Sequence, residues 1–83
     1  MFEIVLSNQA EKFIRKADKT LARRLAQQLE SLKSEPSGHD SKRIIGRELF
    51  RVRVGDYRIL YAVKYDQNKI LVEKIDHRER VYD

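Results

Sequence analysis

The dipeptide Gly55-Asp56 separates two apolar, β-prone runs, residues 49–54 and 57–63, and constrains the fold more than any other feature of the chain. Gly-Asp suits a two-residue turn of type II′ or I′, so the two runs predict a β-hairpin. A two-residue turn also fixes the register. The expected cross-strand pairs are Phe50–Tyr61, Arg51–Leu60, Val52–Ile59, Arg53–Arg58 and Val54–Tyr57.

Because side chains alternate between the two faces of a sheet, this register places Arg51, Arg53 and Arg58 together on one face. Arg53 and Arg58 then lie directly opposite each other. Like charges in this arrangement destabilise a sheet, whereas an opposite-charge pair would contribute about 0.2–1 kcal/mol. One interpretation is that these side chains extend into solvent and keep the sheet soluble. We favour an anion site, because guanidinium groups stay charged and match phosphate bidentately.

The net charge of +5 favours a polyanionic partner. The basic excess does not come from the arginine-containing part, because residues 48–83 hold eight Lys or Arg against seven Asp or Glu. A cationic patch would therefore arise from sorting of charges between faces. This distribution points to a shaped site rather than a basic tail.

The length of 83 residues suits one small domain, residues 1–83. The chain has no Cys, so we expect neither a disulfide framework nor a thiolate metal site. No apolar run approaches the roughly 18–20 residues of a membrane span. The first residues lack the positive start of a signal peptide, and we expect a cytoplasmic protein that does not associate with membranes.

The remaining elements are two helices and two strands. Residues 2–6 predict a short strand, buried on most of both faces. Ser7 can cap a first helix with an apolar stripe, and Asp18 or Thr20 can cap a second. The stripes are Ala10, Phe13, Ile14 and Ala17 in the first helix, and Leu21, Leu25, Leu29 and Leu32 in the second.

A loop at residues 34–40, a turn at 65–69 and a further strand at 70–75 complete the pattern. The order is βααβββ. We expect an α+β fold, with a small, mainly antiparallel four-stranded sheet and a two-helix hairpin packed on one face. The other face, which carries the arginines, is left open.

Several kinds of chemistry have no support in the sequence. His39 and His77 are far apart, and no carboxylates cluster at ligand spacing, so we expect no metal and no other cofactor. No nucleophile lies in a distinctive Ser-His-Asp or Cys-His context. The arginine face remains, together with the closing residues His77, Arg78, Arg80 and Tyr82.

This basic set suits either passive binding of a nucleic-acid backbone or stabilisation of a phosphate attacked by an RNA 2′-hydroxyl. Tyr82 suits stacking on an unpaired base, worth about 1–3 kcal/mol, or a partly packed terminal position. His77 alternatively lies at the surface just after a strand. Lys42, Arg43 and Arg47 either line the entrance to the arginine face or form a solvated linker.

These residues resemble the RelE/ParE superfamily of bacterial and archaeal toxin–antitoxin systems. The resemblance covers nearly the whole chain and rests on residues 50–61, on Ile44-x-Gly46 and on His77-Arg78-x-x-Val81-Tyr82. It implies a βααβββ fold with a cationic concave face. RelE-like members are metal-independent endonucleases that cut mRNA in the ribosomal A site, whereas ParE-like members inhibit DNA gyrase.

The resemblance implies a role for each matching residue. Arg58 would stabilise the pentavalent phosphorane, Arg78 would assist the leaving 5′-oxygen, and Tyr82 would orient a base. Arg51 and Arg53 would hold the RNA backbone, with Lys42, Arg43, Arg47 and Arg80 as further RNA-binding residues.

The general base is a departure from the family pattern. RelE-like enzymes often carry lysine at the positions of Arg51 and Arg53, and one of these lysines is the proposed base. Arginine is effectively always protonated, so Arg53 is a poor base. An imidazole has an unperturbed pKa of about 6.5, which makes His77 the better candidate if it lies on the arginine face.

The resemblance also implies a partner, a small and often acidic antitoxin that neutralises the toxin. Operator DNA would be bound only through that antitoxin, because the chain has no recognisable DNA-reading helix. The leading hypothesis is a ribosome-dependent mRNA endonuclease that inhibits translation. The alternatives are a gyrase inhibitor and a catalytically weak module that binds only antitoxin or nucleic acid.

Overall fold

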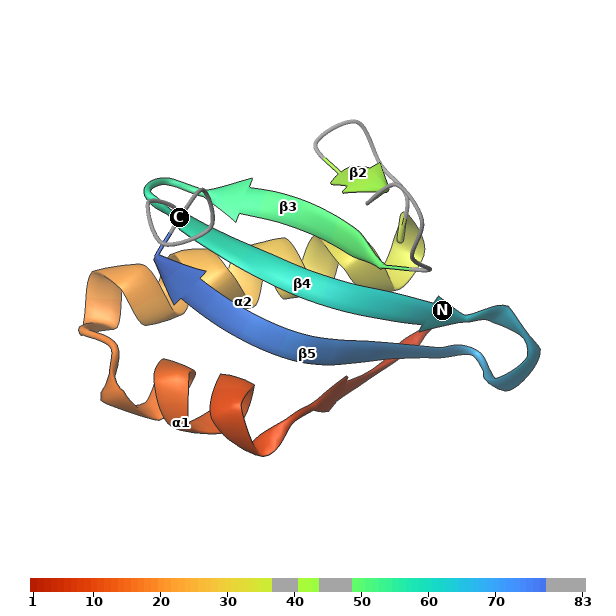
Figure 1. Cartoon of the computed structure of the whole chain (residues 1–83), viewed down its shortest axis with the longest axis horizontal. Helices are drawn as coiled ribbons and strands as arrows, with labels where there is room; N and C mark the ends of the chain where they lie inside the picture. Colours follow the sequence, from red (N-terminus) through yellow and green to blue (C-terminus); the bar gives the residue numbers. More distant parts are fainter. Residues whose placement is uncertain (37–40, 44–48, 78–83) are drawn as a thin grey trace.

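A mixed sheet with two helices on one face forms the molecule (Figure 1). The computed structural model describes residues 1–36, 41–43 and 49–77. Its strands run in the order β1-β5-β4-β3-β2. The elements are β1 (Glu3–Leu6), α1 (Asn8–Lys16), α2 (Lys19–Ser34), β2 (Ser41–Arg43), β3 (Phe50–Val54), β4 (Tyr57–Lys64) and β5 (Lys69–His77). The predicted α+β class, element order and helix placement are confirmed, and the sheet has one more strand than predicted.

The hairpin of β3 and β4 has the predicted register at all five pairs, including Arg53 opposite Arg58. Gly55 adopts a φ of 61°, and Asp56 is not among the residues with positive φ. Positive φ at the first central residue alone is the pattern of a type II′ turn, so type I′ is excluded. The predicted turn at residues 65–69 is also present, as a 3₁₀ turn at Tyr65–Gln67 followed by Asn68 with φ 54°.

Strand β5 extends past the predicted 70–75 segment and includes Asp76 and His77. It pairs antiparallel with β4, and the register shifts between Leu60, opposite Lys74, and Tyr61, opposite Val72. Glu73 is therefore an extra residue on β5, a β-bulge. The shift restores the apolar face, because Val72 and Ile75 are both buried.

Strand β1 lies at one edge of the sheet and pairs in parallel with β5. Ile4 and Leu6 pack against the core, while Val5 on the other face is 40% exposed. The prediction that this strand is buried on both faces is therefore wrong. An edge strand covered by helices on one side alternates like any half-buried strand.

Strand β2 forms the other edge and pairs antiparallel with β3, with Lys42 opposite Arg51 and Arg43 opposite Phe50. No strand was predicted at these residues. Three residues are too short to show the alternation that marks a strand in sequence.

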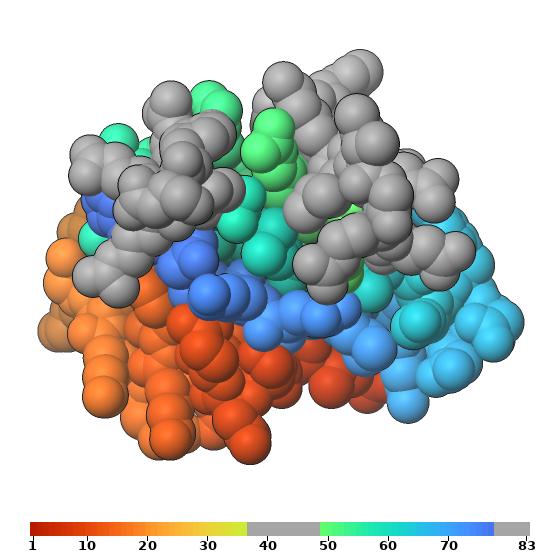
Figure 2. Space-filling view, in the orientation of Figure 1, coloured from red at the N-terminus to blue at the C-terminus, as the bar shows by residue number. Residues whose placement is uncertain are grey.

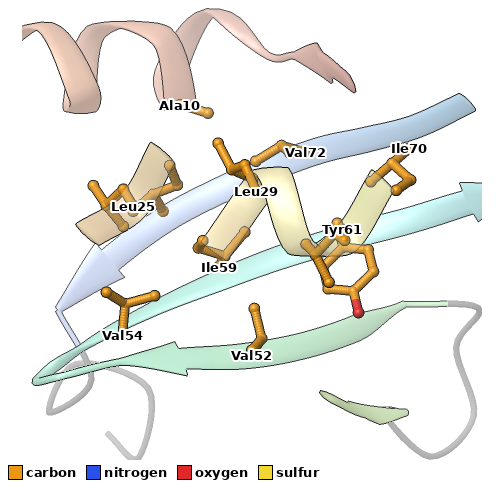
Figure 3. Close-up of a cluster of buried hydrophobic side chains, with 11 residues drawn as sticks. Ala10, Leu25, Leu29, Val52, Val54, Ile59, Tyr61, Ile70 and Val72 are labelled. Carbon is orange, nitrogen blue, oxygen red and sulfur yellow. The ribbon is translucent and has the colours of Figure 1, made fainter. Parts of the chain in front are cut away.

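Both helices begin at predicted caps, and α2 carries its predicted stripe. In α1 the stripe ends at Ile14, because the helix ends at Lys16 and Ala17 is already extended. The Ser7 side chain accepts a hydrogen bond from the Ala10 N–H, and the Asp18 carboxylate accepts one from the Leu21 N–H. Their apolar residues meet the sheet in a single core (Figure 3). It comprises Ala10, Leu25, Leu29, Leu32, Val52, Val54, Ile59, Tyr61, Ile70, Val72 and Ile75. Neither described helix is long and apolar enough to cross a membrane.

Two polar side chains fasten α1 to β5 beside the bulge. The Ser7 hydroxyl donates to the Glu73 carbonyl over 2.8 Å. The Gln9 amide donates to the Ile75 carbonyl over 2.7 Å and accepts from the Ile75 N–H over 2.9 Å. These contacts hold the end of β5, which carries Asp76 and His77.

Candidate functional site

The face of the sheet opposite the helices carries the predicted arginines. The registers of β3, β4 and β5 align Arg51, Arg53 and Arg58 with Lys74 and Asp76, and we call these five residues the arginine face. In Figure 2, side chains of β3, β4 and β5 lie at the surface on the side away from α2. The structure therefore brings together the three predicted arginines of the hairpin.

The three arginines have different environments. Arg53 is exposed and Arg51 is half-buried. The Arg58 side chain is only 12% exposed, although its Cα partner across the strands is another arginine. A guanidinium that is largely removed from water beside a like charge needs a compensating partner.

Asp76 is that partner. Its Oδ1 lies 4.0 Å from Arg58 Nε, and its Oδ2 lies 3.6 Å from Lys74 Nζ. From sequence, Asp76 was placed in the closing segment and had no predicted role. Its face became clear only from the structure, because β5 continues past Ile75 after the bulge at Glu73.

His77 lies on the opposite side of the sheet from the arginine face, which corrects the prediction of its placement. It pairs with Tyr57, and the two rings contact edge to face at 5.1 Å. Phe13 contacts Tyr57 in the same way at 5.6 Å, so these rings form an aromatic cluster beside α1. Because β5 continues through Asp76, successive side chains point to opposite faces, and Asp76 faces the arginines instead.

A hollow lies next to this aromatic cluster. It is lined by Lys12, Phe13, Lys16, Ala17, Asp18, Leu21, Tyr57, Asp76 and His77. It lies between α1, the start of α2 and the ends of β4 and β5. His77 therefore lines this hollow beside the core and is half-buried.

The other predicted site residues are placed only in part. Lys42 stands opposite Arg51 in the register of β2 and β3, and Arg43 stands opposite Phe50. Arg47, Arg78, Arg80 and Tyr82 lie outside the described residues, as does His39. In the described ranges, no three His, Cys, Asp or Glu side chains gather in a way that could hold a metal ion.

Solved structures with this fold include toxins of the RelE type. The isolated E. coli RelE toxin superposes with a TM-score of 0.84 at 21% identity, over 99% of this chain and 92% of that one. At this identity the match establishes the fold alone. The archaeal RelE of Pyrococcus horikoshii, solved with RelB, gives 0.80 at 26% identity, over 95% of this chain and 97% of that one.

The family follows from the sequence comparison. A family model described as ParE toxin of type II toxin–antitoxin systems, parDE, matches residues 4–82, and the chain belongs to this family. A Methanocaldococcus jannaschii protein named as a toxin, RelE1, is 40% identical over 58 residues, covering 65% of this chain. The matched stretch spans 64% of that relative, somewhat less than two thirds of its length.

Proposed function

We propose that this toxin is an endoribonuclease that cleaves mRNA in the ribosomal A site and so inhibits translation. One observation carries the proposal: Arg53 and Arg58 face each other across the hairpin, with Arg51 on the same face. Such an arrangement costs stability. Beyond the compensation that Asp76 gives to Arg58, an RNA backbone would bring further negative charge to these guanidinium groups.

In the proposed reaction, a 2′-hydroxyl loses its proton to water and attacks the adjacent phosphodiester. The bond from phosphorus to the 5′-oxygen breaks, which gives a 2′,3′-cyclic phosphate and a 5′-hydroxyl that takes its proton from water. Negative charge builds on the phosphorane, and Arg58 stabilises it with donors already in place. Arg51 and Arg53 hold the backbone, with Lys42, Arg43, Arg47 and Arg80 as further contacts. Arg78 assists the leaving oxygen and Tyr82 orients a base. These groups stabilise charge without a metal ion.

We also propose that a small, acidic antitoxin neutralises the toxin. The Pyrococcus horikoshii relative was solved as a complex of RelE with RelB, and the net charge of +5 favours an acidic partner. Binding of operator DNA would then belong to the complex rather than to this chain.

Inhibition of DNA gyrase is the second candidate function. The specific observation that favours it is the family model itself, which is described as a ParE toxin. It predicts arrested growth with DNA damage and intact mRNA.

The test is induced expression in cells with mapping of mRNA 5′ ends, for wild type and an Arg58→Ala, Arg78→Ala double variant. We expect new ends confined to translated frames in wild type and their loss in the double variant. Arg23→Ala is the matched control, since Arg23 is an exposed arginine on α2, behind the sheet. Arrest without such ends would favour gyrase inhibition, and absence of arrest would favour a module that only binds.

A further inference from the structure

Asp76 is a carboxylate placed inside a cationic face. It is the Cα partner of Arg58 across β4 and β5, and its side chain is only 16% exposed. A face that merely attracted RNA would bind it more tightly without this negative charge. The position of Asp76 therefore needs a reason other than attraction of a polyanion.

The contact between Asp76 and Arg58 is buried, but its two facing atoms are too far apart for a hydrogen bond. Asp76 Oδ1 and Arg58 Nε are both buried, and neither has a hydrogen-bond partner among the residues that the structure describes. Their separation of 4.0 Å is about 1 Å longer than a charge-assisted hydrogen bond. Lys74 Nζ, 3.6 Å from Oδ2, holds the carboxylate from its other side. A small rotation of either side chain would complete the bond between Arg58 and Asp76.

The contact with Asp76 is made by the Nε edge of the Arg58 guanidinium. Within the described part of the chain, Nε is the only Arg58 nitrogen that is buried without a partner. The ion pair with Asp76 is made through Nε, which leaves the terminal nitrogens Nη1 and Nη2 as the pair that a phosphate would meet. These two nitrogens form a planar fork that matches two oxygens of a phosphate.

We propose that Asp76 is a positioning residue that holds the Nε edge of Arg58 and so turns the Nη1 and Nη2 fork toward the phosphodiester. The proposal rests on the proposed ribonuclease function and adds a residue to it. Asp76 does not contact RNA in this arrangement, and it acts only through Arg58. Its negative charge also compensates one of the two positive charges that face each other in the Arg53–Arg58 pair.

The first experiment is a double-mutant cycle with Asp76→Asn, Arg58→Ala and both changes together. Steady-state cleavage of mRNA on programmed ribosomes gives kcat and KM for each variant. We expect Asp76→Asn to lower kcat by about 10- to 100-fold, the effect of a catalytic group misplaced by about 1 Å. Its KM should stay unchanged or fall, because the face loses a negative charge. In the Arg58→Ala background, Asp76→Asn should change kcat less than twofold.

Two further variants serve as controls. Asp66→Asn removes the same charge from an exposed aspartate in the turn between β4 and β5, and it should leave kcat and KM unchanged. Asp76→Glu keeps the carboxylate and should restore part of the lost kcat.

Several outcomes would overturn the proposal. An equal fold loss of kcat from Asp76→Asn in the wild-type and Arg58→Ala backgrounds would show that Asp76 acts independently of Arg58. A kcat–pH profile that loses one limb on Asp76→Asn in both backgrounds would show the same. An unchanged kcat in Asp76→Asn, or equal losses in Asp76→Glu and Asp76→Asn, would also contradict a positioning role.

A second measurement does not depend on catalysis. Hydrogen exchange at the Arg58 Nε–H, followed by nitrogen-15 NMR, should be slow in wild type and in Asp76→Glu but fast in Asp76→Asn. If wild type cleaves no RNA while this difference is found, the ribonuclease proposal fails and the pairing of Asp76 with Arg58 stands. If wild type and Asp76→Asn exchange equally fast, the positioning role is wrong even where RNA is cleaved.

Discussion

The backbone of Gly55 adopts a conformation that residues with a side chain rarely adopt. Its φ of 61° lies in the left-handed region, and a Cβ built there would come within 2.9 Å of Arg24 Nη1. We predict that Gly55→Ala lowers the free energy of unfolding by about 1–2 kcal/mol, mainly through the backbone penalty. Urea denaturation of wild type and variant measures the change.

Asp56→Ala is the matched control, because Asp56 occupies the same turn without a positive φ. Adding Arg24→Ala to Gly55→Ala separates the two sources of strain. Since the Arg24 guanidinium is the far end of a flexible side chain, its removal should restore little stability. Full recovery in the double variant would show that the clash, rather than φ, was the cause.

The candidate site shows what single residues reveal in sequence and what they conceal. Arg51, Arg53 and Arg58 were grouped correctly, because one two-residue turn and the alternation of strands determine their register. Asp76 and His77 were not separated correctly, because their faces depend on a bulge at Glu73 and on β5 continuing past Ile75. A bulge moves every later side chain of the strand to the other face of the sheet. The position of the bulge depends on the partner strand.

At the scale of elements, the junction of α1 with β5 depends on one side chain. The Gln9 amide makes two hydrogen bonds with the backbone of Ile75, which is fully buried. We predict that Gln9→Ala destabilises the protein by about 1–3 kcal/mol, because the Ile75 N–H and carbonyl lose their partners. Urea denaturation gives the total, and hydrogen exchange at the Ile75 amide shows whether the loss is local.

Gln27→Ala is the control for this prediction, since Gln27 is exposed on α2 and has the same side chain. It should change stability by less than about 0.5 kcal/mol. Equal effects of the two variants would mean that the Gln9 contacts contribute nothing beyond helix propensity.

Elements whose signals are local could be predicted, and elements defined by distant partners could not. The hairpin, both helix caps and the turn before β5 follow from a few neighbouring residues. Strand β2 and the parallel pairing of β1 with β5 depend on contacts across many residues, and a three- or four-residue strand carries too little pattern to name its partner. The class of fold was still predicted because the two longest strands contain apolar runs bounded by turn residues and both helices have apolar stripes.

At the scale of the molecule, RNA binding should respond to salt through the arginine face. Binding to single strands weakens with a slope of about 0.7 in log Kd against log salt for each phosphate neutralised. We predict that Arg51→Ala reduces this slope by about 0.7 for a short single-stranded RNA. Titrations at several salt concentrations measure the slope.

Arg23→Ala removes the same charge from α2, on the other side of the sheet, and should leave the slope unchanged. Equal changes in the two variants would mean that net charge, rather than the arginine face, governs binding.

The strand order has a consequence for the timing of synthesis. Strand β5, the last described strand along the chain, lies between β1 and β4, and residues 3–6 of β1 pair with residues 69–72. Strand β1 is synthesised well before β5 and pairs with no other described strand, so its pairing waits for these residues, which at about 5–20 residues per second takes several seconds. Asp76 and Arg58 meet only after that, so a nascent chain acquires its arginine face only once β5 has been synthesised.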